Sequence, residues 1–167
     1  FLLHAPRQTG KTTCLLALAI HLNQTGQYHA VYANIEAAQA WRENVEQGMA
    51  TLITNIALSA RDLVGDRGAM PLMRQVLSTS APGAMLELFL SDWCQQLEKP
   101  LVLLLDEVDA LVGDTLISLL RQLRAGYPKR PGQFPQTVIP VSYTHLRAHE
   151  TVLDLVCRLL LEKKKQT

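Results

Sequence analysis

The sequence predicts an α/β fold in which a mostly parallel sheet lies between layers of helices. Short apolar runs typical of strands alternate, within residues 1–140, with segments that repeat apolar side chains at helical spacing. The run Leu101–Leu105 is apolar throughout, as expected of a parallel strand buried on both faces. This alternation favours parallel strands joined by crossover helices, and the chain length allows one domain.

The first half of the chain supplies two strands and the helices between them. Residues 1–4 predict a short strand, residues 10–22 a helix, and residues 28–35 a second strand rich in β-forming residues. A long helix is expected within residues 37–64. Its apolar positions recur at helical spacing: Val45, Met49, Leu52, Ile53, Ile56, Ala60, Leu63 and Val64.

The second half continues the same alternation. Helices are expected from Pro71 and over residues 83–97, ahead of the apolar strand that ends at residue 106. Asp114 or Thr115 is the predicted N-cap of a further helix that ends at Gly126. A proline-containing loop follows over residues 127–136, and residues 137–139 begin another strand.

The segment between the first strand and the first helix has the pattern of a phosphate-binding loop. Residues 5–12 match G-x-x-x-x-G-K-[ST] except that Ala5 replaces the first glycine. In such loops backbone N–H groups surround a β-phosphate, the Lys reaches the β- and γ-phosphates, and the hydroxyl binds Mg²⁺. The candidate nucleotide-binding residues are Ala5, Pro6, Arg7, Gln8, Thr9, Gly10, Lys11, Thr12 and Thr13.

Two carboxylates end the apolar strand. Asp106 and Glu107 follow Leu105, and ligands of open α/β sheets bind at the carboxyl edge of the strands. An acid at this point can reach a Mg²⁺ ion held by the loop of the first strand. Thr12 and Asp106 are therefore the candidate metal ligands.

These motifs resemble those of known ATPases. Asp106–Leu111 resembles the Asp-Glu-hydrophobic-Asp-Ala-Leu signature of AAA+ ATPases, and the motif spacing resembles the additional-strand, catalytic-glutamate division of P-loop NTPases. Residues 1–140 are similar to a bacterial AAA-like ATPase family related to signalling (STAND) ATPases. The resemblance implies an ATP hydrolase with a three-layer P-loop NTPase fold. In it Glu107 polarises the attacking water, Lys11 neutralises phosphate charge, and Asp106 holds Mg²⁺.

Three functions stay open at this stage. The first is an ATPase that couples Mg·ATP binding and hydrolysis to conformational change. The others are a nucleotide-operated signalling switch with little turnover and a DNA-associated loader or transposition helper. ATP is favoured over GTP because the guanine-reading motif Asn-Lys-x-Asp is absent. The partner is expected to be a second copy of the chain or another protein. Glu36, Arg121 and Arg124 are expected to be solvated rather than to contact the nucleotide.

The last 27 residues resemble translated sequencing-adapter DNA. Residues 141–151 match, residue for residue, the translation of a transposase-type adapter, and residues 155–164 that of a flow-cell adapter. We therefore interpret residues 1–140 as a partial ATPase core, truncated at both ends, and residues 141–167 as an artefact. Hydrolysis is expected of the full-length protein, and weak nucleotide binding of the fragment.

The charge of the chain bears on its partners, and its cysteine content bears on its compartment. The chain has 16 basic and 15 acidic residues, and residues 1–140 hold 11 and 12 of these. This balance does not favour nucleic acid or an anionic membrane as a partner. The sequence has no apolar run near the roughly 18 residues of a membrane span. Cys14 and Cys94 are predicted to be reduced core residues, which indicates a cytoplasmic protein.

Overall fold

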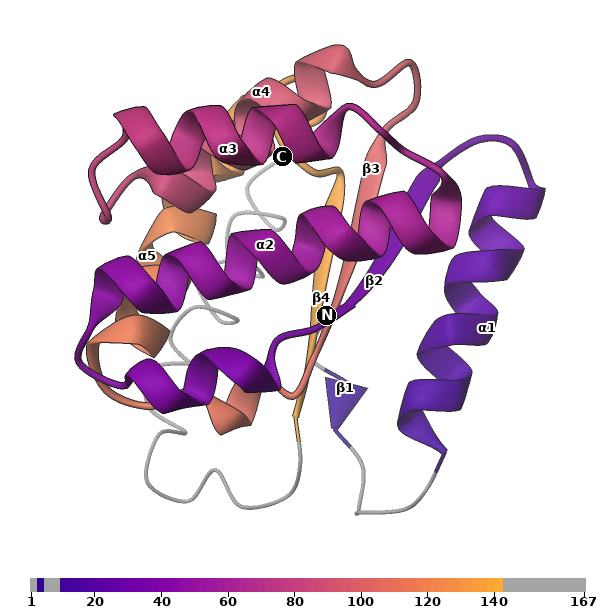
Figure 1. Ribbon diagram of the computed structural model, residues 1–167. Coiled ribbons are helices and arrows are strands. Elements are labelled where there is room, and N and C mark those ends of the chain that lie inside the picture. Colours follow the sequence, from indigo (N-terminus) through magenta and orange to yellow (C-terminus); the bar gives the residue numbers. More distant parts are fainter. Residues whose placement is uncertain (1–2, 5–9, 143–167) are drawn as a thin grey trace, which may run out of the picture.

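A parallel sheet forms the centre of the molecule. The computed structural model describes residues 3–4 and 10–142 (Figure 1). The strands are β1 (Leu3–His4), β2 (His29–Asn34), β3 (Leu101–Asp106) and β4 (Thr137–Ser142), in the spatial order β1-β4-β3-β2. All three strand pairs are parallel, so the predicted α/β fold with a parallel sheet is confirmed.

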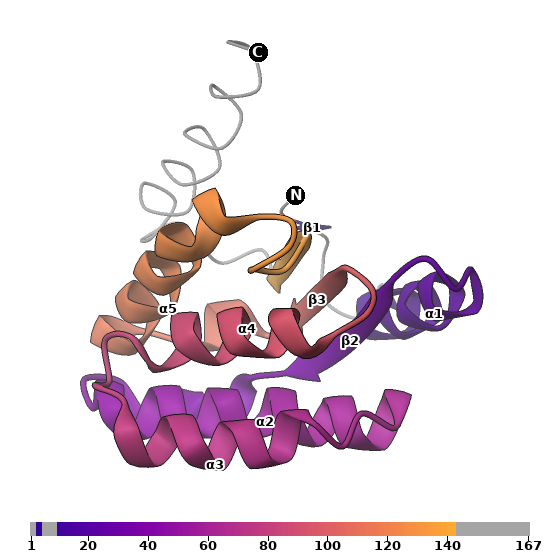
Figure 2. The same ribbon diagram turned by 90° about the horizontal axis from the view of Figure 1, so that it is seen from above.

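Helices cover both faces of this sheet. Figure 2 shows α1 (Lys11–Gln24) apart from the other helices, which gather on the opposite face. Those helices are α2 (Val45–Val64), α3 (Ala69–Thr79), α4 (Met85–Gln96) and α5 (Gly113–Gly126). Three short 3₁₀ helices complete the described elements: η1 (Glu36–Trp41), η2 (Val108–Ala110) and η3 (Tyr127–Lys129).

The apolar run of β3 fills the cores on both faces. Leu103 and Leu105 belong to the larger core, with side chains of α2 to α5. Val102 and Leu104 belong to the smaller core, with Leu15 of α1. Because side chains alternate along a strand, β3 needs apolar residues at every position to bury both faces. All six residues of β3, including the terminal aspartate, are buried.

The predicted helix over residues 37–64 is two elements. Residues 36–41 form η1, and Asn44 caps α2 by accepting a hydrogen bond from Gln47 N–H at 3.2 Å. Leu63 belongs to the apolar repeat but is 53% exposed. The other apolar positions of the repeat are fully or partly buried, as helical spacing predicts: Val45, Met49, Leu52, Ile53, Ile56, Ala60 and Val64.

The predicted N-cap of α5 is also wrong. The helix begins at Gly113, and neither Asp114 nor Thr115 caps it. Gly113 has φ +66°, a left-handed conformation that favours glycine and turns the chain into the helix. Thr115 is buried against Gly48 of α2, where a Cβ would lie 2.6 Å from its side chain. Thr115 is thus a close-packing residue between α5 and α2.

The two cysteines lie in different environments. Cys94 is buried in the larger core, and burial raises the pKa of its thiol to about 12. Cys14 is exposed, which corrects its predicted core position. The reason is helical phase, because Leu15 and Ala19 form the buried stripe of α1 and Cys14 precedes it on the outer face.

The last strand continues past the predicted boundary at residue 140. Val141 is buried and pairs with Leu3, and Ser142 pairs with His4. Residues 143–167 lie outside the described residues, so the adapter interpretation of residues 141–167 stays a prediction. Within the described residues, no helix has the length and apolarity needed to cross a membrane.

Candidate functional site

The beginning of α1 carries the described part of the predicted loop. Ala5, Pro6, Arg7, Gln8 and Thr9 lie outside the described residues. Gly10 has φ +75°, and its carbonyl accepts the N–H of Cys14 at 2.8 Å, which closes the first turn of the helix. Lys11 is buried at the first helical position, whereas Thr12 and Thr13 are exposed. The free N–H groups and positive dipole end of a helix start favour an anion at this place.

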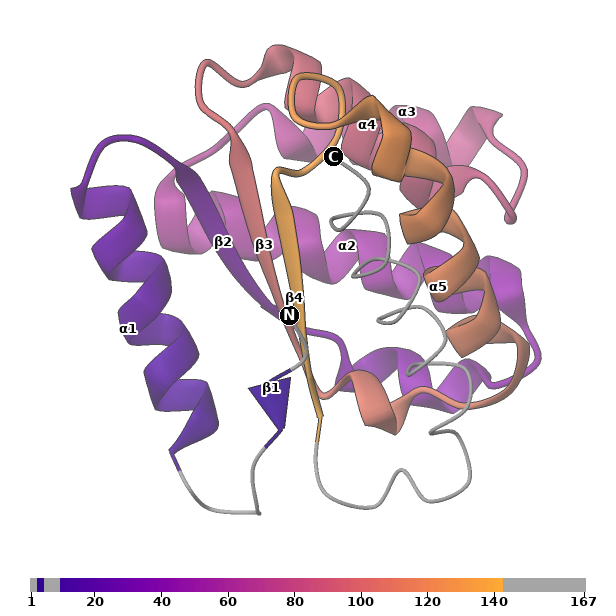
Figure 3. The ribbon, with the colours of Figure 1, turned by 180° about the vertical axis from the view of Figure 1, so that it is seen from behind.

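The two predicted metal ligands meet at the carboxyl edge of the sheet. Thr12 Oγ1 donates a hydrogen bond of 2.7 Å to Oδ2 of Asp106, although the residues are 94 positions apart. Asp106 ends β3 and is only 1% exposed. Figure 3 shows that α1 begins near the lower end of the sheet, where β1, β3 and β4 also end. The fold therefore joins the two sequence motifs in one site.

Glu107 has an unusual backbone conformation beside this aspartate. Its φ and ψ are 63° and 35°, in the left-handed region, and it precedes η2. Its N–H donates a hydrogen bond of 3.1 Å to Oδ1 of Asp106. Non-glycine residues with positive φ are uncommon, and strained conformations of this kind cluster at functional sites.

Tyr32 is a further residue of the site that the sequence motifs do not reveal. Its hydroxyl donates a hydrogen bond of 3.1 Å to Oδ2 of Asp106, the oxygen that also accepts from Thr12. Burial, together with the charge of Asp106, raises the pKa of Tyr32 to about 12, so the hydroxyl is a proton donor at neutral pH. The alternation of residues along β2 indicates that Tyr32 lies on the side of the sheet that faces α1. Its contact with Asp106 follows only from the register of β2 with β3, which the sequence of one strand does not reveal.

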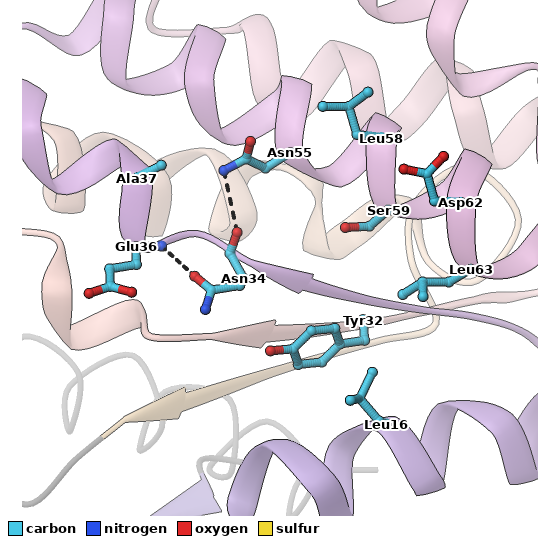
Figure 4. Close-up of a pocket in the computed structure, with 10 residues that line it drawn as sticks. All are labelled: Leu16, Tyr32, Asn34, Glu36, Ala37, Asn55, Leu58, Ser59, Asp62 and Leu63. Carbon is cyan, nitrogen blue, oxygen red and sulfur yellow. Dashed lines mark hydrogen bonds between the residues drawn. The ribbon is translucent and has the colours of Figure 1, made fainter.

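A groove of about 680 Å³ lies beside Tyr32, along the outer strand β2. Figure 4 shows Leu16 of α1 on one side of β2 and Leu58, Ser59 and Leu63 of α2 on the other. Glu36 is exposed and lines this groove, and Arg121 and Arg124 are exposed on α5. The exposure expected of these three side chains is thus observed, and their lack of contact with a nucleotide stays a prediction.

The residues at the site fit a magnesium ion held jointly with a nucleotide. Mg²⁺ prefers oxygen ligands and usually takes one or two carboxylates together with phosphate oxygens and water. Asp106 and Thr12 supply a carboxylate and a hydroxyl at one place. Among residues 3–4 and 10–142, no group of three or more His, Cys, Asp and Glu residues could hold a metal. The described part of the site is therefore no metal cage built from protein side chains alone.

The comparisons with known proteins give no match. No protein-family model, curated protein or solved structure matches this chain.

Proposed function

We propose that this chain is the nucleotide-binding core of a P-loop ATPase that binds Mg·ATP and hydrolyses it. The observation that carries the proposal is the 2.7 Å hydrogen bond between Thr12 and Asp106. It links the residue after the Gly-Lys pair to the acid at the end of a separate strand. Phosphate-binding and metal-binding motifs must converge in this way to hold one Mg·nucleotide complex.

The strand order supports the same proposal. β3, which ends in the two carboxylates, pairs with β2 on one side and with residues 137–140 of β4 on the other. An additional strand at this position distinguishes the catalytic-glutamate division that the sequence resembles. The Glu107 backbone, held in the left-handed region next to Asp106, adds a second feature typical of functional sites.

The roles of the residues follow from their chemistry. Lys11 neutralises the charge of the β- and γ-phosphates, while Thr12 and Asp106 hold the metal, directly or through water. Bound Mg²⁺ stabilises the charge that develops on the phosphate oxygens. Glu107 polarises the attacking water, which must lie in line with the γ-phosphate. The positive end of the α1 dipole would stabilise the charge of the phosphates.

The test is a binding measurement, because binding precedes any turnover. A fluorescent ATP analogue is titrated into the 167-residue chain with Mg²⁺ and with EDTA, and unlabelled ATP and GTP then compete for the site. Lys11→Ala is expected to weaken binding in both conditions. Thr12→Val and Asp106→Asn are expected to lose the gain in affinity that Mg²⁺ provides. Loss of one charge-assisted contact costs about 1.5–3 kcal/mol, which is roughly tenfold or more in affinity.

Thr25→Val is the matched control, because Thr25 is an exposed threonine at the opposite end of α1. It should bind as the unaltered chain does. The proposal fails if the unaltered chain binds neither ATP nor Mg·ATP. It also fails if the Lys11, Thr12 and Asp106 variants all bind as tightly as the control.

A further inference from the structure

Three donors surround the buried carboxylate of Asp106. Oδ2 accepts two hydrogen bonds, from Thr12 Oγ1 at 2.7 Å and from the Tyr32 hydroxyl at 3.1 Å, and Oδ1 accepts one from Glu107 N–H. An ionised carboxylate has about four acceptor positions. Because these donors act on both oxygens, they fix both the tilt and the rotation of the group.

The Tyr32 ring is held independently of its hydroxyl. In the register of β2 with β3, Asn34 lies opposite Asp106 and Tyr32 opposite Leu104. The ring packs on the smaller core, which contains Leu15 and Leu104, and its outer side lines the groove shown in Figure 4. Packing therefore directs the hydroxyl at Asp106, and the bond does not depend on a flexible side chain.

We propose that Tyr32 is a positioning residue that orients Asp106 for the metal ion. Its hydroxyl holds Oδ2 beside Thr12. The carboxylate and the Thr12 hydroxyl are thereby oriented together, before binding, for the coordination shell of the metal. This inference rests on the proposed function. Without the hydroxyl, Oδ2 loses a donor and the carboxylate is held less firmly. Loss of such an outer-shell partner typically lowers metal affinity by about 10–100-fold.

The test compares Tyr32→Phe with Tyr28→Phe. The first removes the hydroxyl that bonds Asp106 and keeps the ring. The second removes a hydroxyl from a half-buried tyrosine packed on the same smaller core. For each chain, affinity for the fluorescent ATP analogue is measured with EDTA and with Mg²⁺, and thermal unfolding is followed without ligand.

Tyr32→Phe is expected to bind ATP without metal as the unaltered chain does. Its Mg²⁺-dependent gain in affinity should fall by about tenfold or disappear. Tyr28→Phe should keep the full gain. If Tyr32→Phe does not fold, Tyr32→Met is measured against the same expectation, since it fills similar space without a hydroxyl.

The outcomes separate this inference from the proposed function. If the unaltered chain binds no ATP, the proposed function fails and the role of Tyr32 falls with it. If the unaltered chain shows the gain and Tyr32→Phe keeps it in full, the role of Tyr32 is overturned and the function stands. If Tyr32→Phe weakens binding equally with and without Mg²⁺, Tyr32 is merely structural, and the inference is again overturned.

Discussion

At the residue scale, Glu107 has a strained backbone conformation. Its φ of 63° places Cβ close to neighbouring backbone atoms, and in L-residues this conformation costs roughly 1–2 kcal/mol. Its N–H bonds the carboxylate of Asp106, so the strained conformation belongs to the site itself. The strain is retained where glycine would have avoided it, which is consistent with a required side chain.

This strain predicts an inverted order of stability for two substitutions. Glu107→Gly should be more stable to denaturant than Glu107→Ala by about 1 kcal/mol, because only glycine adopts positive φ without a Cβ penalty. The free energy of unfolding of the two variants is compared by urea titration.

The matched pair is made at Arg74, an exposed residue inside α3. There Arg74→Ala should be more stable than Arg74→Gly by about 1 kcal/mol, the usual order in helices. The same order at both positions would show that the Glu107 backbone is not strained in solution.

The sequence predicts the acidic and hydroxyl members of the site better than its phenol. Thr12 and Asp106 belong to short motifs whose spacing encodes their chemistry. Tyr32 belongs to no motif, and its contact depends on the register of β2 with β3. Register is decided by the packing of both cores at once, and a single strand does not reveal it.

At the scale of elements, α4 obtains its N-terminal cap from another helix. Ala84, at the N-cap position, has no capping side chain. Gln122 of α5 supplies the acceptor, because its Oε1 receives the N–H of Leu86 at 2.8 Å and of Glu87 at 3.2 Å. Its Nε2 donates to the carbonyl of Pro82 and to Ser118 Oγ. One buried amide thus ties α5 to the start of α4.

Gln122→Ala should therefore destabilise the protein strongly. It leaves two N–H groups of α4 and one carbonyl without this partner inside the protein, at a cost of about 2–4 kcal/mol. The urea midpoint should fall while its slope stays constant.

Gln95→Ala is the control, since Gln95 is exposed on α4 and its Nε2 donates within the helix to the carbonyl of Ser91. Its effect should stay within about 0.5 kcal/mol. Equal effects of the two substitutions would contradict the capping role of Gln122.

Helix existence is predicted well here and helix ends are not. The apolar repeat of α2 depends on local spacing, so Met49 to Ala60 appear where the sequence places them. The start of α5 depends on Gly113 and on the packing of Thr115 against Gly48, which join distant segments. Cap propensity alone favoured Asp114 or Thr115, and tertiary packing overrode it.

At the scale of the whole molecule, His29 connects the sheet to two helices. Its Nε2 lies 3.3 Å from Oδ2 of Asp66, just after α2, at ion-pair distance but without hydrogen-bond geometry. The indole N–H of Trp93 in α4 donates to the same oxygen at 2.8 Å, and the His29 ring meets the Trp93 ring edge to face. Burial lowers the pKa of His29; Lys99 lowers it further and Asp66 partly opposes the shift.

This shift predicts a loss of stability in mild acid. As pH falls below 6.5, the ordinary pKa, the unfolded chain takes up a proton at His29 before the folded protein does. The free energy of unfolding should therefore fall from pH 6.5 downwards and level off below the folded pKa. His29→Gln should flatten this part of the profile, measured by urea titration at a series of pH values.

His21→Gln removes an exposed histidine of α1 and is the control. It should leave the slope unchanged. A profile that is equally steep in His29→Gln would exclude His29 as the source of the acid sensitivity.

The order of the strands in the sheet cannot be predicted from the apolar pattern of short segments. Apolar alternation predicts that parallel strands exist, but the placement of β4 between β1 and β3 joins the two ends of the described chain. The resemblance to ATPases implied an additional strand but not its place in the sheet. Pairings this distant are selected by the cores on both faces together, which no short window of sequence contains.

That placement has a consequence for how the protein is made. β4 pairs with β3 through residues 137–140, opposite residues 102–105. During synthesis β3 emerges before β4, and its apolar run has one open edge until residues 137–140 leave the ribosome. Open apolar strand edges favour aggregation. Pairing with β4 therefore ends the interval in which this edge of β3 is exposed.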